Sequence, residues 1–373
     1  MLQSKLLSIA LVSLALLAGC GGKNHRPNPT PLVPAVQAAK TKAEAEEQIA
    51  WRDAATLRLE GKGWQTETPF VRLPDSAQSL VTEKVWVQSR YSAGLAIHFT
   101  TNSKTIATKW PGGGQLKNMT AIGVSGLDLY IRNATAPEKS QWSWAGVGKP
   151  NTGPTTATLA TFPTAEEREF LLFLPLYATC NTLEIGLDPQ ATLQQPAPNP
   201  AKKPIVFYGT SIVQGGCASR TGMAHTALLR RWLNREVINL GFSGAGAMEI
   251  EIADLLGELD PAVIVIDTLP NTTTALMGER YIPFINRLRQ HHPTVPLVLV
   301  GHIMGDKLPD RNNRMEEIIA KLTASGLQNF TYIPGRDLIA GPEEATVDGV
   351  HPTDLGFMRM AEVHYRVLKD ILK

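Results

Sequence analysis

The chain has 373 residues, of which 43% are hydrophobic, and a formal net charge of +2. This length is enough for about two ordinary domains. Lysine and arginine nearly balance aspartate and glutamate, and they form no cluster long enough to follow a line of phosphates. We therefore expect no nucleic-acid partner.

The N-terminal residues have the pattern of an export signal. Lys5 precedes an apolar stretch over 6–17, which is too short to span a bilayer comfortably, and small residues then lead to Cys20. The ending LAGC resembles a bacterial lipobox, which implies that residues 1–19 are a lipoprotein signal peptide and that Cys20 is lipidated. A short membrane helix with an incidental cysteine is the alternative. We expect an exported cell-envelope lipoprotein, and Gly21 favours the outer membrane.

Two segments rich in proline and polar residues divide the remainder. Residues 20–50 have no periodicity and are predicted to be a tether from the membrane. Residues 191–203 form a linker that marks a domain boundary. The cysteines that lipidation leaves over, Cys180 and Cys217, are predicted to be free buried thiols, although an oxidising compartment would permit them to pair.

Residues 51–190 are predicted to form an all-β sandwich. Short alternating segments recur, bounded by Gly, Pro, Asn or Ser: FVRLP, VWVQSR, GLAIHFTT, TIATKW, LDLYIRN, WSWAGV, FLLFLPLY and TLEIGL. This half also holds six of the seven tryptophans. Trp142 and Trp144 are two residues apart on one expected strand, so they either form a platform for a sugar ring or fill the core or domain interface. We favour the second interpretation.

Residues 204–373 have a different pattern. Near-continuous apolar runs alternate with helix-period stretches, and the runs are PIVFYG, EVINLG, AVIVID, PLVLVG and FTYIPG. This alternation is typical of a parallel sheet of about five strands covered by helices on both faces. Such sheets bind ligands beyond the carboxyl ends of their strands.

The loops that follow these strands carry the residues of acyl transfer. GTS follows the first strand, GFSGAG the second, DTLPN the third and DGVHPTD the fifth. Ser211 is the candidate nucleophile, His351 the base that activates it, and Asp348 the carboxylate that orients the imidazole. The backbone amides of Ser211 and Gly244 and the side chain of Asn271 are candidate donors to the oxyanion.

The four blocks in this order resemble those of the SGNH (GDSL-like) hydrolase superfamily, whose namesake residues correspond to Ser211, Gly244, Asn271 and His351. Upstream, GVSGLDLYIRN resembles the Gly-x-Asp-Leu-Tyr β-domain of one bacterial esterase branch. The resemblance implies a flavodoxin-like three-layer α/β/α hydrolase domain after a jelly-roll-like β-sandwich. It also implies O-acetyl groups of carbohydrates as substrates. One departure is Thr210, which stands where the family usually has aspartate.

Other polar residues near the strand ends compete weakly for these roles. His302 and Asp267 are expected to support the site, and His225 to shape the edge of its pocket. The histidines lack the spacing of a zinc motif, and no glycine-rich loop matches a dinucleotide or phosphate fingerprint. We therefore expect neither a metal nor a cofactor.

The sequence thus predicts a lipid-anchored serine esterase that hydrolyses short-chain O-acyl esters on small molecules or polysaccharides. The loops around Ser211 offer Gly, Ala, Ser, Thr and Asn rather than Leu or Phe, which favours acetyl over long acyl chains. Two alternatives remain open at this point. One is a lipase or lysophospholipase, suggested by the membrane anchor, and the other is a carbohydrate-binding lipoprotein with an inactive hydrolase domain.

Overall fold

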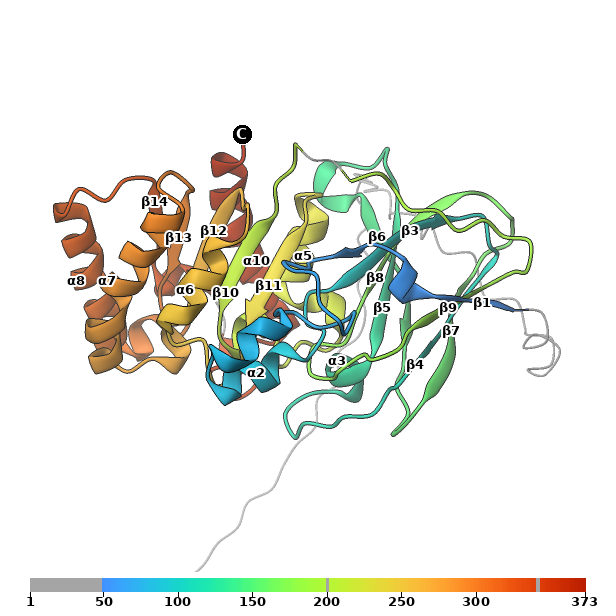
Figure 1. The fold of residues 1–373 in the computed structure, drawn as a ribbon, viewed down its shortest axis with the longest axis horizontal. Helices are drawn as coiled ribbons and strands as arrows, with labels where there is room; N and C mark the ends of the chain where they lie inside the picture. Colours follow the sequence, from blue (N-terminus) through green and yellow to red (C-terminus); the bar gives the residue numbers. More distant parts are fainter. Residues whose placement is uncertain (1–48, 199–200, 340–342) are drawn as a thin grey trace, which may run out of the picture. The chain divides into compact units, whose positions relative to one another are not determined.

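The structure is a computed structural model that describes residues 49–198, 201–339 and 343–373 (Figure 1). Residues 46–373 belong to one compact unit. The predicted signal peptide, Cys20 and most of the predicted tether lie outside the described residues. Within the described ranges, no helix combines the length and the apolar character that crossing a membrane requires.

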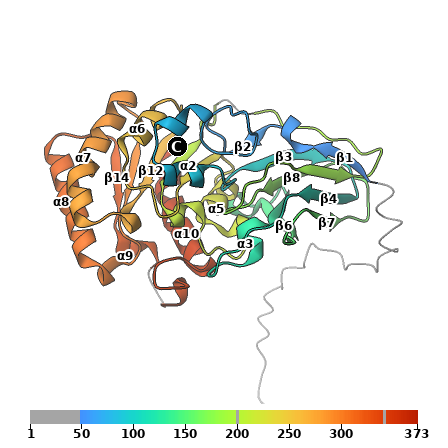
Figure 2. The same cartoon turned by 60° about the horizontal axis from the view of Figure 1, so that its bottom comes forward.

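The N-terminal half contains two antiparallel sheets, as the alternating segments predict. Sheet A has the strand order β1-β9-β4-β7 and sheet B the order β2-β3-β8-β5-β6. Figure 2 shows the two sheets packed face to face, and apolar side chains from both, such as Ile106 and Phe170, fill one buried cluster. The strands are β1 (Ala50–Asp53), β2 (Leu59–Glu60), β3 (Ala96–Thr101), β4 (Thr105–Trp110), β5 (Leu127–Arg132), β6 (Trp142–Gly148), β7 (Thr155–Thr161), β8 (Arg168–Phe173) and β9 (Glu184–Leu187).

Two of the predicted strands are wrong. VWVQSR forms helix α2 (Glu83–Ser89), and FVRLP forms no strand. The alternation in VWVQSR suggested a strand, but Thr82 caps the helix by accepting a hydrogen bond from the Val85 amide. Val85 and Ser89, four residues apart on one helix face, are the buried positions.

Trp142 and Trp144 also differ in their surroundings. Trp142 is buried in a cluster with Ala227 of the C-terminal half, whereas Trp144 is 49% exposed and donates its indole N–H to Asp128. Although both lie on β6, only Trp144 presents a face to solvent. A two-ring sugar platform is therefore not formed, and Trp142 fills the interface between the halves.

The C-terminal half contains the expected five-stranded parallel sheet, sheet C, in the order β11-β10-β12-β13-β14. This is the flavodoxin-like order, in which the first strand lies between the second and the third. The strands are β10 (Ile205–Gly209), β11 (Val237–Gly241), β12 (Val263–Asp267), β13 (Leu297–Val300) and β14 (Phe330–Ile333). The remaining helices are α3 (Ala121–Ser125), α4 (Ser211–Gln214), α5 (His225–Trp232), α6 (Ile250–Gly257), α7 (Thr274–His291), α8 (Pro309–Ala324), α9 (Gly335–Leu338) and α10 (Asp354–Ile371).

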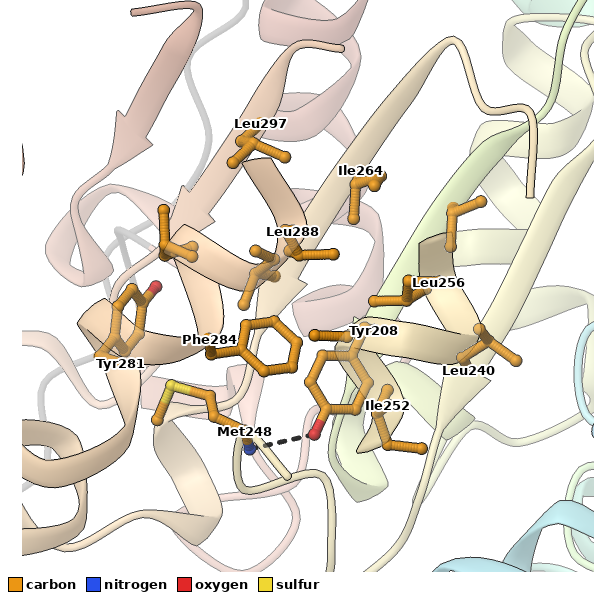
Figure 3. Packing of buried hydrophobic residues seen from close by; sticks show 14 of the residues in the cluster. Tyr208, Leu240, Met248, Ile252, Leu256, Ile264, Tyr281, Phe284, Leu288 and Leu297 are labelled. Atoms are coloured by element: carbon orange, nitrogen blue, oxygen red, sulfur yellow. Dashed lines mark hydrogen bonds between the residues drawn. The ribbon is translucent and has the colours of Figure 1, made fainter. Parts of the chain in front are cut away.

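Helices cover both faces of sheet C because its strands are apolar on both sides. On β10, Val206 and Tyr208 belong to a buried cluster that includes residues of α6, α7 and α8, while the alternate residues Ile205 and Phe207 belong to a cluster that includes residues of α5 and α10. In Figure 3 the Tyr208 ring lies against Phe284 of α7, and its hydroxyl accepts a hydrogen bond from the Met248 amide. The packed layers hold the strand ends, and the loops that follow them, at fixed positions.

Candidate active site

Ser211 begins α4 directly after β10. A Cβ on Gly209 would lie 2.3 Å from the carbonyl oxygen of Asp267, so the strand must end in glycine for the turn to form. Thr210 is buried and caps α4, since its hydroxyl accepts a hydrogen bond from the Ile212 amide at 3.3 Å. Threonine thus performs a local structural task at the position where the family usually has aspartate.

The structure brings Ser211, His351 and Asp348 together. The Ser211 hydroxyl lies 3.0 Å from Nε2 of His351, and Nδ1 of the same ring lies 2.8 Å from Oδ2 of Asp348. The other Asp348 oxygen accepts hydrogen bonds from the amides of His351 and Val350, at 2.8 and 3.1 Å. A hydroxyl, an imidazole and a carboxylate bonded in sequence can move a proton away from the hydroxyl oxygen.

The carboxylate of Asp348 is held in its charged form. Partial burial works to raise its pKa, but the hydrogen bonds from the His351 amide and ring and from the Val350 amide lower it to about 2. Asp348 is therefore ionised at neutral pH and can stabilise a protonated imidazole.

The predicted oxyanion loops lie against the serine loop. Gly244 and Gly246 have φ of +67° and +70°, and a Cβ on Gly246 would lie 2.1 Å from the carbonyl oxygen of Gly209. The Asn271 side chain, in the turn after β12, donates a hydrogen bond to the carbonyl of Ala245. An amide nitrogen carries two protons, so Asn271 keeps one donor for a substrate oxygen.

Two residues that the sequence analysis missed hold these loops in position relative to each other. Gln214 is fully buried; its side chain donates to the carbonyl of Leu176 at 3.1 Å and accepts from the Ser243 amide at 2.9 Å. Tyr177 donates its hydroxyl to the carbonyl of Ser211 at 3.2 Å. Both contacts reach the segment that follows β8, so the N-terminal half supports the serine loop. Gln214 lies within the GTSIVQGG block. The sequence signal that could have indicated its role is a polar side chain directly after the apolar Ile212 and Val213.

The competing residues take no part in the hydrogen bonding between Ser211, His351 and Asp348. His302 is buried and contacts Arg311 at 3.2 Å; burial, reinforced by that cation, lowers its pKa to about 4. Asp267 is buried at the end of β12, and burial raises its pKa to about 7. His225 is fully buried and stacks on Phe357 at 5.8 Å, so the expectation that it shapes the pocket edge is wrong.

Cys180 and Cys217 are both free and buried, as predicted. In the part of the chain that the structure describes, Cys217, Asp348 and His351 are the one group of three whose possible ligand atoms lie within 4.8 Å of one another. Both ring nitrogens of His351 already have partners in Ser211 and Asp348. The arrangement is therefore better suited to proton transfer than to holding a metal.

Comparison with known families matches both halves. Residues 202–369 match the GDSL-like lipase/acylhydrolase family, and residues 49–193 match the GxDLY family, the N-terminus of SGNH-hydrolase-type esterases. No curated protein matches the chain.

Solved structures share this fold over most of the chain. A protein described as a GDSL-like lipase from Bacteroides ovatus is 36% identical, with a TM-score of 0.81 over 87% of this chain and 98% of that one. A salicylyl-acyltransferase from a tetracycline biosynthetic pathway is 18% identical, with a TM-score of 0.70 over 89% and 98%. A family two carbohydrate esterase from Clostridium thermocellum, solved with cellohexaose, is 16% identical, with a TM-score of 0.55 over 75% and 93%. The last two likenesses concern the fold.

Proposed function

Because the chain belongs to the GDSL-like lipase/acylhydrolase family, and so is an esterase or acylhydrolase, we propose that it removes short acyl groups from carbohydrates through Ser211, His351 and Asp348. The observation that carries this proposal is the continuous hydrogen bonding from the Ser211 hydroxyl through His351 to Asp348. It lies beyond the carboxyl ends of sheet C, where parallel sheets bind ligands.

In the first half of the reaction, Ser211 Oγ attacks the ester carbonyl while Nε2 of His351 takes the hydroxyl proton. The carbonyl electron pair moves to oxygen, and the tetrahedral intermediate is negatively charged there. Asp348 stabilises the positive imidazole that results. His351 then gives the proton to the departing sugar oxygen, the ester bond breaks, and the acyl group remains on Ser211.

In the second half, water replaces the sugar. The water oxygen attacks the acyl carbon while His351 takes a proton from the water. His351 then gives that proton to Ser211 Oγ when the acid leaves. The oxyanion forms in both halves, with the Ser211 and Gly244 amides and the free N–H of Asn271 as its donors. Losing one such donor typically costs about 10² to 10³ in rate.

Two observations support a short acyl group on a carbohydrate. The turns around Ser211 are built from small and polar residues, among them Gly244, Ala245 and Asn271. The fold is shared with carbohydrate esterases of family two, one of them solved with cellohexaose. The alternatives are a lipase or lysophospholipase, and a carbohydrate-binding lipoprotein with an inactive hydrolase domain.

We also propose export and lipid anchoring through Cys20, which the LAGC ending supports. Labelled palmitate fed to the host should enter the wild-type protein and not Cys20→Ala. Equal labelling of the two would refute the anchor.

The catalytic assignment is tested by Ser211→Ala. Members of a triad act as a unit, so this variant should lose about 10⁴-fold or more in kcat on p-nitrophenyl acetate and should not react with a fluorophosphonate. Ser140→Ala is the control, since Ser140 lies exposed in the turn Glu138–Ser140. A Ser211→Ala protein that keeps a tenth of the wild-type kcat would exclude Ser211 as nucleophile. Absence of fluorophosphonate labelling in the wild type would favour the inactive binding protein.

The length of the acyl chain distinguishes the two enzymatic hypotheses, a carbohydrate esterase and a lipase. Each CH₂ buried in an acyl tunnel contributes about 0.8 kcal/mol, close to fourfold in kcat/KM, so a lipase would improve steeply from acetate to octanoate. We expect the opposite order for p-nitrophenyl esters, and higher rates still on acetylated oligosaccharides. A tenfold preference for octanoate would replace the carbohydrate proposal by the lipid one.

A further inference from the structure

Lys84 lies over the oxyanion loop. A Cβ on Gly244 would lie 2.5 Å from the Lys84 ammonium nitrogen and 2.6 Å from its Cε. Lys84 is exposed, on the first turn of α2, in a segment more than a hundred residues before the loop it covers. Among the described residues, its ammonium forms no hydrogen bond or ion pair. The cation is therefore available to a ligand that reaches Gly244.

A buried arginine holds the helix that carries Lys84 against the strand before the Gly244 loop. Arg72 is 1% exposed and donates to the carbonyls of Gln88 and Tyr91, at the end of α2, and to those of Asn239 and Gly241, at the end of β11. One guanidinium thus joins the helix that carries Lys84 to the strand that leads into the Gly244 loop. Burial lowers the pKa of Arg72 to about 9, so it stays charged at neutral pH.

Two acids that adjoin Lys84 or the Gly244 loop in the chain are directed elsewhere. Glu83 precedes it on α2, and adjacent side chains of a helix do not face each other. Glu249, which follows the Gly244 loop, is turned inward and accepts hydrogen bonds from the Tyr208 hydroxyl and the Ala247 amide. Neither carboxylate neutralises the ammonium.

From this placement we propose that Lys84 selects substrates that carry a carboxylate close to the reacting ester. The inference rests on the proposed esterase function and specifies its substrate class. A carboxylate can belong to the alcohol side, as in an acetylated uronic acid, or to the acyl side, as in a succinyl ester. In both cases it would meet the ammonium as the ester carbonyl approaches Gly244, and a charge-assisted hydrogen bond would form.

The experiment compares two matched pairs of esters. On the alcohol side, an acetylated galacturonic-acid oligosaccharide is compared with its acetylated galactose counterpart. On the acyl side, mono-p-nitrophenyl succinate is compared with p-nitrophenyl acetate. For each pair, the ratio of kcat/KM for the charged to the neutral ester is measured in wild type, Lys84→Gln and Lys84→Glu. The control is Lys321→Glu, an equal charge change on α8.

We expect Lys84→Gln to lower the ratio about three- to fivefold in one of the pairs, which is the size expected of a charge pair at an exposed site. Lys84→Glu should lower it further, 1 M salt should reduce the wild-type ratio, and Lys321→Glu should leave it unaltered. The pair that responds identifies the side that bears the carboxylate. Equal ratios in all proteins, or an equal loss on charged and neutral esters, would overturn the proposal. A wild type that turned over no ester and resisted fluorophosphonate would instead overturn the esterase function.

Discussion

The carboxylate proposed to act in catalysis, Asp348, and a carboxylate at the interface between the halves, Asp128, are built in opposite ways. The Asp348 side chain is 39% exposed, and its partners all belong to its own turn. The Asp128 side chain is fully buried and accepts hydrogen bonds from Arg220, from the Gly222 amide and from the Trp144 indole. A charge that takes part in a reaction stays near water, whereas a charge that joins two halves of the protein is enclosed by donors.

This difference in exposure determines whether each carboxylate should affect the reaction rate or the stability of the fold. Removing an exposed charge costs little stability, because water solvates the site that remains. Removing one partner of a buried pair leaves the other charge unpaired in a medium that solvates it poorly. Substitutions near Asp348 should therefore change the rate, and substitutions near Asp128 should change the stability.

In the comparison of the two carboxylates, the largest expected effect is the loss of kcat in Asp348→Asn. An asparagine of the same shape can hold the His351 ring but stabilises neither the correct tautomer nor the imidazolium, so kcat should fall by about 10³ to 10⁴. The midpoint of urea unfolding should change little. Asp354→Asn is a nearby control, because Asp354, the first residue of α10, accepts its hydrogen bonds from Ser219. Similar losses of kcat in the two variants would show that the loop, and not the Asp348 charge, sets the rate.

The second effect is on stability. Arg220→Ala leaves Asp128 buried with three neutral donors, the Gly222 amide, the Trp144 indole and the Tyr130 hydroxyl, and the free energy of unfolding should fall by about 3 kcal/mol. Adding Asp128→Asn should restore part of this loss, because the unpaired charge is then gone. Arg314→Ala removes a surface pair with Glu317 on α8 and should cost less than about 1 kcal/mol. Equal costs for Arg220→Ala and Arg314→Ala would contradict the distinction between buried and exposed pairs.

The region of the proposed active site was more predictable from the sequence than the interface between the halves. The five strands of sheet C are continuous apolar runs, and the loops after them meet at one edge whatever the details of packing, so Ser211 and His351 could be placed together. Asp348 lies three residues before His351, within reach of a local turn.

The contacts between the halves depend on pairs of residues far apart in the chain. Nothing in the residues around Arg72 shows that its guanidinium will meet four carbonyl groups, two of them on β11. The alternation of VWVQSR likewise suggested a strand rather than α2. Val85 of this helix packs in a core supplied mainly by the C-terminal half. Local patterns predict helices, strands and the sheet edge at which the loops meet. The partner of a buried charge depends instead on the assembled fold.

A second interface cluster joins the halves through Glu60, His98, Glu169, Arg132 and Arg230. The His98 ring lies 2.8 Å from Glu60 and 2.7 Å from Glu169, and Arg230 and Arg132 each pair with one of these acids. Burial alone would lower the pKa of His98, but its hydrogen bonds to the two carboxylates raise it above its ordinary value of 6.5. Burial would raise the pKa of Glu60, but Arg230 and His98 lower it to about 2.

The smallest expected effect follows from these pKa shifts. His98 binds its proton more tightly in the folded state, so its stabilisation is complete below pH 6.5 and is lost as the pH rises through its raised pKa. Glu60 contributes above its ordinary pKa of 4.5 and loses its contribution as the pH falls through about 2. The cluster therefore stabilises most between about pH 4.5 and 6.5.

His98→Gln should lower the free energy of unfolding by about 2 kcal/mol at pH 6, and by less at pH 9, in urea titrations followed by tryptophan fluorescence. His291→Gln, which removes a half-exposed pair with Asp254, should cost under about 1 kcal/mol at pH 6. A cost of His98→Gln that stayed the same at pH 6 and pH 9 would mean that the ring stabilises the interface by packing against Trp142 rather than through its charge.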